Sequence, residues 1–147
     1  MKTRMISVLI LIGLGLIVHQ ASSANEKSKQ KKPREHEHWS APPEAARRAN
    51  PIPSDRHSIE RGKRFYQTHC AVCHGSEGKG DGSAAAGLTP RPTDLVSMAG
   101  HHSDGDFAWK ITNGRGAMPA WKAVLSENDI WDLTNFIQSL GKDPHSR

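Results

Sequence analysis

The chain has 147 residues, a formal net charge of +5 and only two cysteines, so it has room for one small domain with extensions. The cysteines stand three positions apart, and a disulfide between them would stabilise little because the stabilisation grows with the length of the closed loop. Residues 25–50 carry seven lysines and arginines against four acidic residues, whereas residues 51–147 carry eleven of each. This balance argues against a nucleic-acid-binding face on the folded part.

Residues 1–24 have the pattern of an export signal. A basic start, MKTR, precedes the apolar run ISVLILIGLGLIV, and small residues follow. Ser22 and Ala24 suit the small positions before a cut, which would leave Asn25 as the mature N-terminus. The alternative is an uncleaved N-terminal anchor, although the run is short of the roughly 20 residues that span a bilayer. Either way, we expect the rest of the chain to be exported, to the periplasm or a similar oxidising compartment.

Residues 25–54 are rich in Lys, Arg, Glu and Pro and have almost no aliphatic side chains. Such a segment cannot bury enough apolar surface to order itself, so we expect a polar, basic, disordered tether. Its charge would favour membrane association at an anionic surface, an effect that its glutamates dilute. His36 and His38 are expected to be solvated, with capture of a metal ion as the alternative.

Residues 55–147 are expected to form an all-α domain with about three main helices, and no strand-like alternation is present. The first helix is predicted over residues 58–69, with Ser58 as its N-cap. The second is predicted over residues 104–112 and ends before Asn113-Gly114. The third, residues 127–140, is the clearest. It has Ser126 as its N-cap with Asp129 three residues on, Gly141 as its stop, and a buried stripe of Ile130, Leu133, Ile137 and Leu140.

A loop of 29 residues, 75–103, separates the first two helices and contains many glycines. Loops of this length are uncommon in small domains unless they wrap around something. The domain also has little apolar volume for a core, so a large flat apolar cofactor would supply the missing interior. The stretch GKGDG in this loop resembles a phosphate-binding glycine loop, but it follows a helix and lacks the GK[ST] ending. We interpret it as turns that bend the chain around the cofactor.

The stretch CAVCH, residues 70–74, has the C-x-x-C-H spacing of c-type haem attachment. The thiols of Cys70 and Cys73 would form thioethers with the two vinyl groups of the porphyrin, and His74 would ligate the iron from one face. Three other readings use the same residues: a thioredoxin-like redox pair, a plain disulfide, and a zinc site completed by two of His74, His101 and His102.

Met118 is the preferred candidate for the second axial ligand. It lies in NGRGAMPAW, after a glycine-rich turn and before the stiff Pro119. A thioether ligand favours ferrous iron and raises the reduction potential. Met98 is the second candidate, and His101 or His102 is the third.

With these pieces in place, residues 58–140 resemble a class I, monohaem cytochrome c of bacterial type. The matching stretches are CAVCHG, GKGDG, LTPRPTDL, GRGAMPAW and DIWDLTNFIQSL. The resemblance implies a small fold in which residues 55–147 wrap around one covalently bound haem c. It also implies that Gly62 and Tyr66 meet Leu133 and Phe136 where the first and last helices cross. A carbonyl within LTPRP, residues 88–92, is expected to accept the N–H of the proximal histidine.

The leading functional prediction is a one-electron carrier between redox partner proteins and not an enzyme, because His74 and Met118 would leave no open iron position. The first alternative is a cytochrome c subunit of a larger oxidoreductase, with the chemistry on another chain. The second is a haem-based sensor in which Met118 yields to a small gas or peroxide. The sequence names neither the electron donor nor the acceptor.

Overall fold

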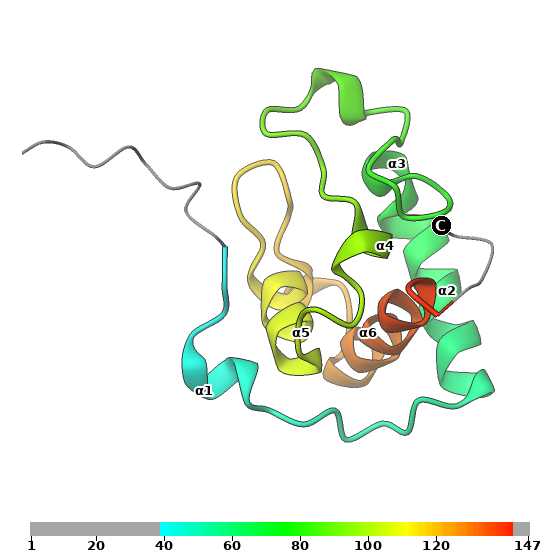
Figure 1. Cartoon of the computed structure of the whole chain (residues 1–147), viewed down its shortest axis with the longest axis vertical. Helices are drawn as coiled ribbons and strands as arrows, with labels where there is room; N and C mark the ends of the chain where they lie inside the picture. The colour runs from blue at the N-terminus through cyan, green and yellow to red at the C-terminus, as the bar shows by residue number, and fades with distance from the viewer. Residues whose placement is uncertain (1–38, 143–147) are drawn as a thin grey trace, which may run out of the picture. The chain divides into compact units, whose positions relative to one another are not determined.

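The computed structural model describes residues 39–142 (Figure 1). The predicted signal peptide, His36 and His38 lie outside the described residues. Within them, the chain is helical, and the sole strand-like feature is an isolated bridge between Arg115 and Met118. The α-helices are α1 (Pro43–Ala46), α2 (Arg56–His69), α3 (Ala71–His74), α4 (Leu95–Met98), α5 (Asp104–Asn113) and α6 (Glu127–Leu140). Two short 3-10 helices are η1 (Ala85–Gly87) and η2 (Trp121–Ala123). The all-α prediction is confirmed.

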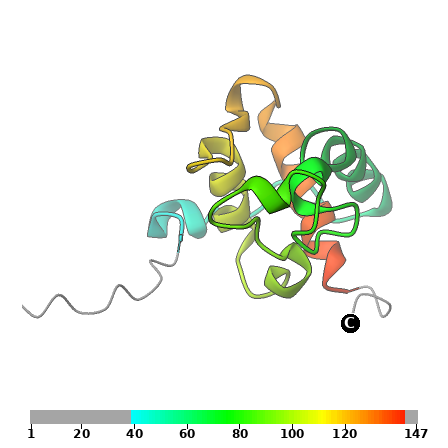
Figure 2. The ribbon, with the colours of Figure 1, turned by 90° about the horizontal axis from the view of Figure 1, so that it is seen from above.

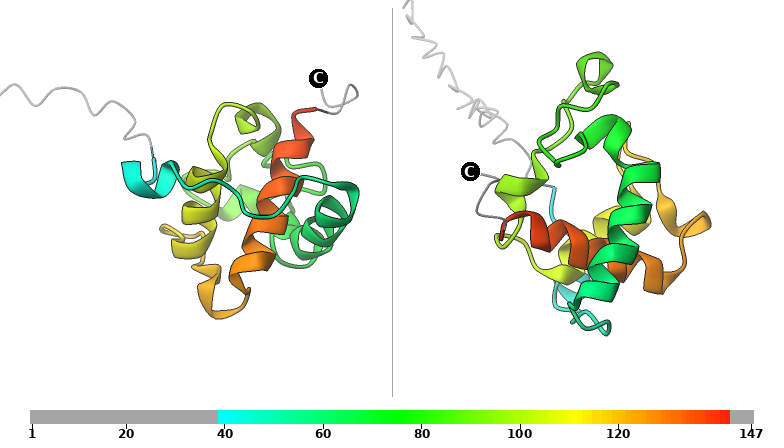
Figure 3. Two further views of the ribbon diagram at one scale, coloured as in Figure 1. Left: turned by 90° about the horizontal axis from the view of Figure 1, so that it is seen from below. Right: turned by 90° about the vertical axis from the view of Figure 1, so that its right-hand side faces the viewer.

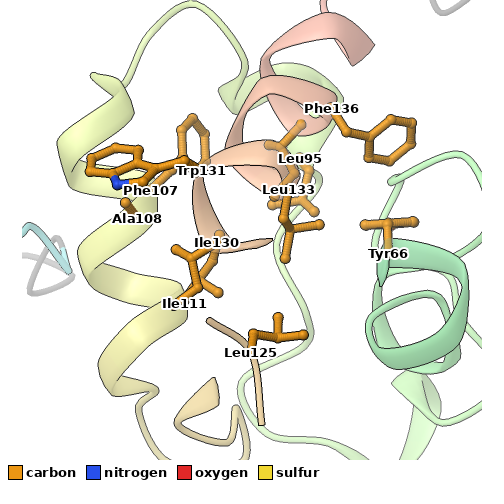
Figure 4. Close-up of a cluster of buried hydrophobic side chains, with 11 residues drawn as sticks. Tyr66, Leu95, Phe107, Ala108, Ile111, Leu125, Ile130, Trp131, Leu133 and Phe136 are labelled. Atoms are coloured by element: carbon orange, nitrogen blue, oxygen red, sulfur yellow. The ribbon is translucent and has the colours of Figure 1, made fainter. Parts of the chain in front are cut away.

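Helices α2 and α6 cross at Gly62, as the resemblance implied. A Cβ atom there would lie 2.1 Å from the Asp132 carbonyl oxygen and 2.9 Å from the Phe136 Cβ, so only glycine allows this approach. One turn further along α2, the rings of Tyr66 and Phe136 pack with centroids 5.0 Å apart (Figure 4). The crossing therefore places the C-terminal end of α2, which leads into CAVCH, against the core.

The core lies between α2, α5 and α6 (Figures 1 and 4). Its buried members from α5 and α6 include Phe107, Ile111, Ile130, Leu133 and Ile137. Three members of the predicted stripe are thus buried, whereas Leu140, at the end of α6, is half-buried and packs against the cluster. Seen from above, the yellow α5 and the teal α2 lie on opposite sides of the orange-to-red α6 (Figure 2).

The start of α2 differs from the prediction. The helix begins at Arg56, and Asp55 is its N-cap, whose side chain accepts a hydrogen bond from the Ser58 backbone N–H at 2.8 Å. Ser58, the predicted cap, is instead fully buried, and its hydroxyl donates to Asp132 of α6 at 2.6 Å. Both residue types cap helices well, and the long-range contact with Asp132 decided between them.

Helix α6 has the predicted bounds and the predicted capping box between Ser126 and Asp129. Gly141 ends the helix as predicted, but not by forming the left-handed glycine cap that was expected. Gly141 has φ −74°, so no left-handed cap forms, but a Cβ there would lie 2.8 Å from the Cβ of Ala99. Helix α5 ends one residue later than predicted, at Asn113, and Gly114 follows with φ +63°.

Residues 39–54, which were expected to belong to the tether, pack on the domain that was expected to start at residue 55. Residues 39–54, which we call the N-terminal strap, run from α1 beside α5 and across α6 to α2 (Figure 3, left). The Ala41 backbone N–H donates to Asp106 at 2.7 Å, and Asn50 Nδ2 donates to Asn135 at 2.8 Å. Polar contacts with α5 and α6 thus order a segment that has little apolar surface of its own.

Between residues 39 and 142, no helix has the length and hydropathy needed to cross a membrane.

Candidate functional site

The three residues of the C-x-x-C-H motif lie on a single turn. Cys70 follows the last residue of α2, and Cys73 and His74 belong to α3. The Cys70 carbonyl accepts hydrogen bonds from the backbone N–H groups of Cys73 at 3.1 Å and His74 at 2.9 Å. This turn fixes the separation of the two thiols and places the imidazole directly after the second one.

The His74 ring is oriented by a hydrogen bond in which Nδ1 donates to the Thr93 carbonyl at 3.0 Å. The acceptor lies one residue beyond the predicted stretch LTPRP. Burial lowers the pKa of His74, and the bond to Thr93 opposes this only in part. A neutral imidazole with its proton on Nδ1 keeps the Nε2 lone pair free for a metal ion.

The glycine-rich stretch after the motif folds back over α3. The N–H groups of Gly80, Gly82 and Ala84 donate to the carbonyls of His74, Cys73 and Val72, at 2.8, 3.1 and 2.9 Å. Gly80 has φ +73°, and a Cβ there would lie 2.4 Å from the Pro92 carbonyl oxygen. The glycines of GKGDG thus serve as turns with close backbone packing, which supports that interpretation over a phosphate loop.

Tyr66 ties the motif to α2. Its buried hydroxyl donates to the Gly75 carbonyl at 2.7 Å, and burial raises the pKa of the phenol. The hydroxyl is therefore protonated at neutral pH and acts as a donor.

Met118 lies in a tight loop between α5 and η2. Its N–H donates to the Arg115 carbonyl at 3.0 Å, and its carbonyl accepts from the Arg115 N–H at 2.9 Å. Gly114 and Gly116 both have positive φ, and a Cβ on Gly114 would lie 2.4 Å from the Met118 carbonyl oxygen. Because the backbone on both sides is fixed in this way, the thioether is presented from a rigid turn.

The Met118 loop approaches the end of α2 through its neighbour Trp121, whose ring packs on His69 with centroids 5.1 Å apart. His69 immediately precedes Cys70. Cys70 and Met118 also pack against the same core cluster. The fold thus brings the predicted distal ligand to the region of the motif.

The other ligand candidates have different neighbours. Met98 ends α4 and packs against the core cluster, as Met118 does, but the following residue, Ala99, lies against Gly141 at the end of α6. His101 is exposed, and His102 contacts the Asp106 carboxylate with Nδ1 at 2.6 Å. Helix α4 also reaches the motif side, because the Leu95 N–H, three residues before Met98, donates to the Gly78 carbonyl at 2.7 Å. The preference for Met118 therefore rests on the glycine-rich turn that carries it.

Comparison with known proteins identifies the family. Residues 57–137 match the family model described as cytochrome c oxidase, cbb3-type, subunit III. The chain belongs to this cytochrome c family. The match confirms the predicted class I cytochrome c family and supports haem c as the cofactor.

Two relatives show how far the similarity extends. A cytochrome c6 from Bumilleriopsis filiformis is 31% identical over 55% of this chain and 90% of its own length. The cbb3-type cytochrome c oxidase subunit FixP of Sinorhizobium medicae is 34% identical over 60% of this chain, but over only 30% of its own length. The chain thus spans less than a third of the oxidase subunits that it matches.

A solved structure gives the same fold. A chain of the Kuenenia stuttgartiensis reducing HAO-like protein complex Kustc0457/Kustc0458 superposes with a TM-score of 0.54 and 28% identity, over 61% of this cytochrome and 46% of that chain.

The residues of this cytochrome fit a covalent haem. Both thiols are free and half-buried, one turn holds them beside His74, and the imidazole has its outer nitrogen bonded and its inner one available. Cys70 and Cys73 would hold the porphyrin, and His74 would hold the iron. The group would supply a reversible one-electron couple.

The rival readings of the motif find no support in the fold. Burial, followed by the neighbouring Cys73, raises the pKa of Cys70 to about 12, whereas a reactive redox cysteine has a lowered one. No strand precedes the motif among the described residues. Nor does any group of three or more His, Cys, Asp or Glu side chains within residues 39–142 have the arrangement of a metal site, so the zinc reading lacks its ligands.

Sequence reasoning missed two residues of this site. Thr93 was missed because nothing local distinguishes its carbonyl from those of the preceding residues; the folding-back of the loop selects it. Tyr66 is predicted only at the helix crossing, with no partner predicted for its hydroxyl. A buried tyrosine nevertheless signals a hydrogen-bond partner.

Proposed function

We propose that this cytochrome is a one-electron carrier whose single haem c is attached through Cys70 and Cys73 and ligated by His74 and Met118. One C-x-x-C-H motif and no further cysteine argue for one haem per chain. The relatives are electron-carrying cytochromes and subunits of an oxidase, so the partners are redox proteins.

The hydrogen bond from His74 to Thr93 is the observation that carries the proposal. It fixes the tautomer and direction of an imidazole that directly follows the two thiols on the same turn. A rigid, preset ligand needs little rearrangement between two oxidation states, which suits electron transfer. The rigid turn that carries Met118 supports the same conclusion for the proposed second ligand.

A visible spectrum tests the attachment and the ligation separately. The holoprotein, made in cells with a haem-ligation system and exported, should show a sharp reduced α-band that survives denaturing extraction, with one iron per chain. A colourless and folded exported protein would contradict the haem assignment.

Met118→Ala should remove the weak far-red band that reports iron–methionine ligation in the oxidised protein, and should lower the reduction potential. Met98→Ala is the matched control, because Met98 is also a partly buried methionine that packs on the core. It should leave both the band and the potential unchanged. The reverse result would assign the ligand to Met98. Prompt binding of carbon monoxide by the reduced wild type would contradict firm Met118 ligation and favour the sensor.

The second candidate function is that of a cytochrome subunit in a larger oxidoreductase, with the catalytic chemistry on another chain. The match to the subunit III family and to FixP supports it. Affinity purification of the tagged chain from its native cells decides between the two: a stoichiometric large subunit indicates the complex, and recovery of the cytochrome alone indicates the free carrier.

We further propose that the chain works outside the cytoplasm, because the N-terminal pattern MKTR followed by an apolar run is that of an export signal. Mass spectrometry of the purified protein gives its N-terminus: Asn25 indicates cleavage, and Met1 an uncleaved anchor.

A further inference from the structure

The N-terminal strap reaches the loop that carries Met118 through the ring of Trp39. This ring is half-buried and meets the Trp109 ring of α5 edge-on, with centroids 6.5 Å apart. The Arg115 guanidinium lies 5.9 Å from the centre of the Trp39 ring, within the range of a cation–π contact. Arg115 belongs to the loop between α5 and η2, three positions before Met118. Two segments that are far apart in the sequence therefore meet at this ring.

Arg115 is joined to Met118 through both of its backbone groups. Its N–H donates to the Met118 carbonyl at 2.9 Å, and its carbonyl accepts from the Met118 N–H at 3.0 Å. This bridge closes the turn formed by residues 115–118. Because the two residues are paired in this way, a contact that restrains the Arg115 side chain also restrains Met118.

The Trp39 ring has a support that does not depend on this turn. The Ala41 N–H, two residues after Trp39, donates to the Asp106 carboxylate at 2.7 Å, and the Lys110 ammonium pairs with the same carboxylate at 2.6 Å. The Lys110 ammonium also lies 5.8 Å from the centre of the Trp39 ring. Since α5 packs into the core, the ring is held on a fixed element and can resist displacement of the turn.

The outer side of the turn is open to solvent. Residues 115–117 and 119–120 are exposed, while Met118 between them is half-buried. A Cβ placed on Gly116 would have no atom within 4 Å. Segments with sparse packing open more readily than the core. A side-chain contact from outside the turn, such as the one that Trp39 makes, therefore has a large share in keeping the turn in place.

We propose that Trp39 is a positioning residue for Met118: its ring holds the Arg115 side chain and so keeps the turn of residues 115–118 docked. The inference rests on the proposed function in one respect, because the docked turn keeps the thioether at the iron only if Met118 is the ligand. The strap then does more than stabilise the fold. It sets how readily an added ligand replaces Met118.

Two measurements on the holoprotein test this role. A detached turn does not keep its hydrogen bonds, so amide exchange of the Met118 N–H in the reduced, ¹⁵N-labelled protein follows its detachment. Titration of the oxidised protein with imidazole, read from the loss of the far-red band, measures the replacement of Met118. Trp39→Ala should speed the exchange and raise the imidazole affinity by about two- to fivefold, as expected for the loss of one exposed cation–π contact. Trp39→Phe keeps an aromatic face and should restore part of both effects.

Asn50→Ala is the matched control, because Asn50 lies in the same strap but donates to Asn135 of α6. It should lower stability and leave both the exchange and the imidazole affinity as in the wild type. A double-mutant cycle isolates the contact itself. Arg115→Ala should have effects similar to those of Trp39→Ala, and the double variant should show little more than either single one.

Unchanged exchange and imidazole affinity in Trp39→Ala, or equal changes in Asn50→Ala, would overturn the positioning role. Faster exchange with unchanged imidazole affinity would overturn its link to the ligand. Failure of the proposed ligation is a separate result, seen when Met118→Ala keeps the far-red band. In that case amide exchange alone decides whether Trp39 holds the turn.

Discussion

Two parts of this cytochrome are fixed by different means. The haem-motif side, residues 70–94, is held by backbone hydrogen bonds between near neighbours, such as Gly80 to His74 at 2.8 Å, and by glycines that allow close approach. The N-terminal strap is held by side chains from far along the chain: Asp106 is 65 positions from its partner Ala41, and Asn135 is 85 from Asn50. The first region can be recognised from a short stretch of sequence, and the second requires the folded structure. Four changes test this contrast, from the largest expected effect to the smallest.

Asn135→Leu should lower the free energy of unfolding by about 3 kcal/mol, because several buried groups lose their partner at once. The Asn135 amide donates to the Ser58 hydroxyl at 2.8 Å and to the Ile52 carbonyl at 3.1 Å, and its oxygen accepts from Asn50. Urea unfolding of the holoprotein measures the change. Asn128→Leu, on the exposed face of the same helix, is the control and should change stability by less than about 0.5 kcal/mol. Equal effects would mean that the strap network contributes nothing.

Gly80→Ala should cost about 2 kcal/mol on the haem-motif side, because the new Cβ meets the Pro92 carbonyl and alanine is strained at φ +73°. Gly87→Ala is the matched control: no atom lies within 4 Å of a Cβ placed there. The difference between the two variants, read from urea unfolding, reports the close packing over the motif. A Gly80→Ala protein as stable as Gly87→Ala would contradict it.

Acid should weaken the attachment of the strap. Burial opposes ionisation of Asp106, but hydrogen bonds from Lys110, from the Ala41 N–H and from His102 outweigh it and lower the pKa of the carboxyl. A lowered folded-state pKa stabilises the folded protein above the unfolded value of about 3.9, and this contribution disappears as the pH falls through the folded pKa.

The Asp106→Asn variant measures this contribution. It should be about 1–2 kcal/mol less stable than the wild type near neutral pH, and the difference should shrink as the pH falls below about 4. Thermal unfolding of both proteins across this range gives the comparison. A difference that stays constant with pH would show that the charge of Asp106 is not what holds the strap.

Trp39→Ala should have the smallest effect, about 1 kcal/mol. The Trp39 ring meets Trp109 edge-on at 6.5 Å, and the Lys110 ammonium and the Arg115 guanidinium lie 5.8 and 5.9 Å from its centre. Trp39→Phe keeps a ring and should restore part of the loss. If the alanine variant is as stable as the wild type, the Trp39 contacts contribute nothing to the stability of the strap.

Local signals predicted what local interactions determine. The capping box of α6 involves Ser126 and Asp129, which are three residues apart, and its prediction is confirmed. The C-x-x-C-H turn likewise depends on consecutive residues. At the start of α2, by contrast, the sequence offers two capping residue types, and the contact of Ser58 with Asp132, 74 positions away, selects Asp55 as the cap.

The strap shows the limit of composition as a guide to order. Its few aliphatic residues predict disorder, because apolar burial usually offsets the entropy of ordering. Here the ordering comes from hydrogen bonds to carboxylate and amide groups of α5 and α6, which are themselves buried: Asp106 and Asn135 are 5% and 2% exposed. A buried Asp and a buried Asn on predicted helices signal that some partner must exist, but they do not say which segment provides it.

The path of the strap also has a mechanical consequence. Residues 41–50 form hydrogen bonds with Asp106, Ser103 and Asn135, in or next to α5 and α6, before the chain reaches α2. Those hydrogen bonds would bear any tension applied from the N-terminal end, for instance by an anchored leader. Helix α2, which leads into the C-x-x-C-H motif, would carry no load until those hydrogen bonds broke.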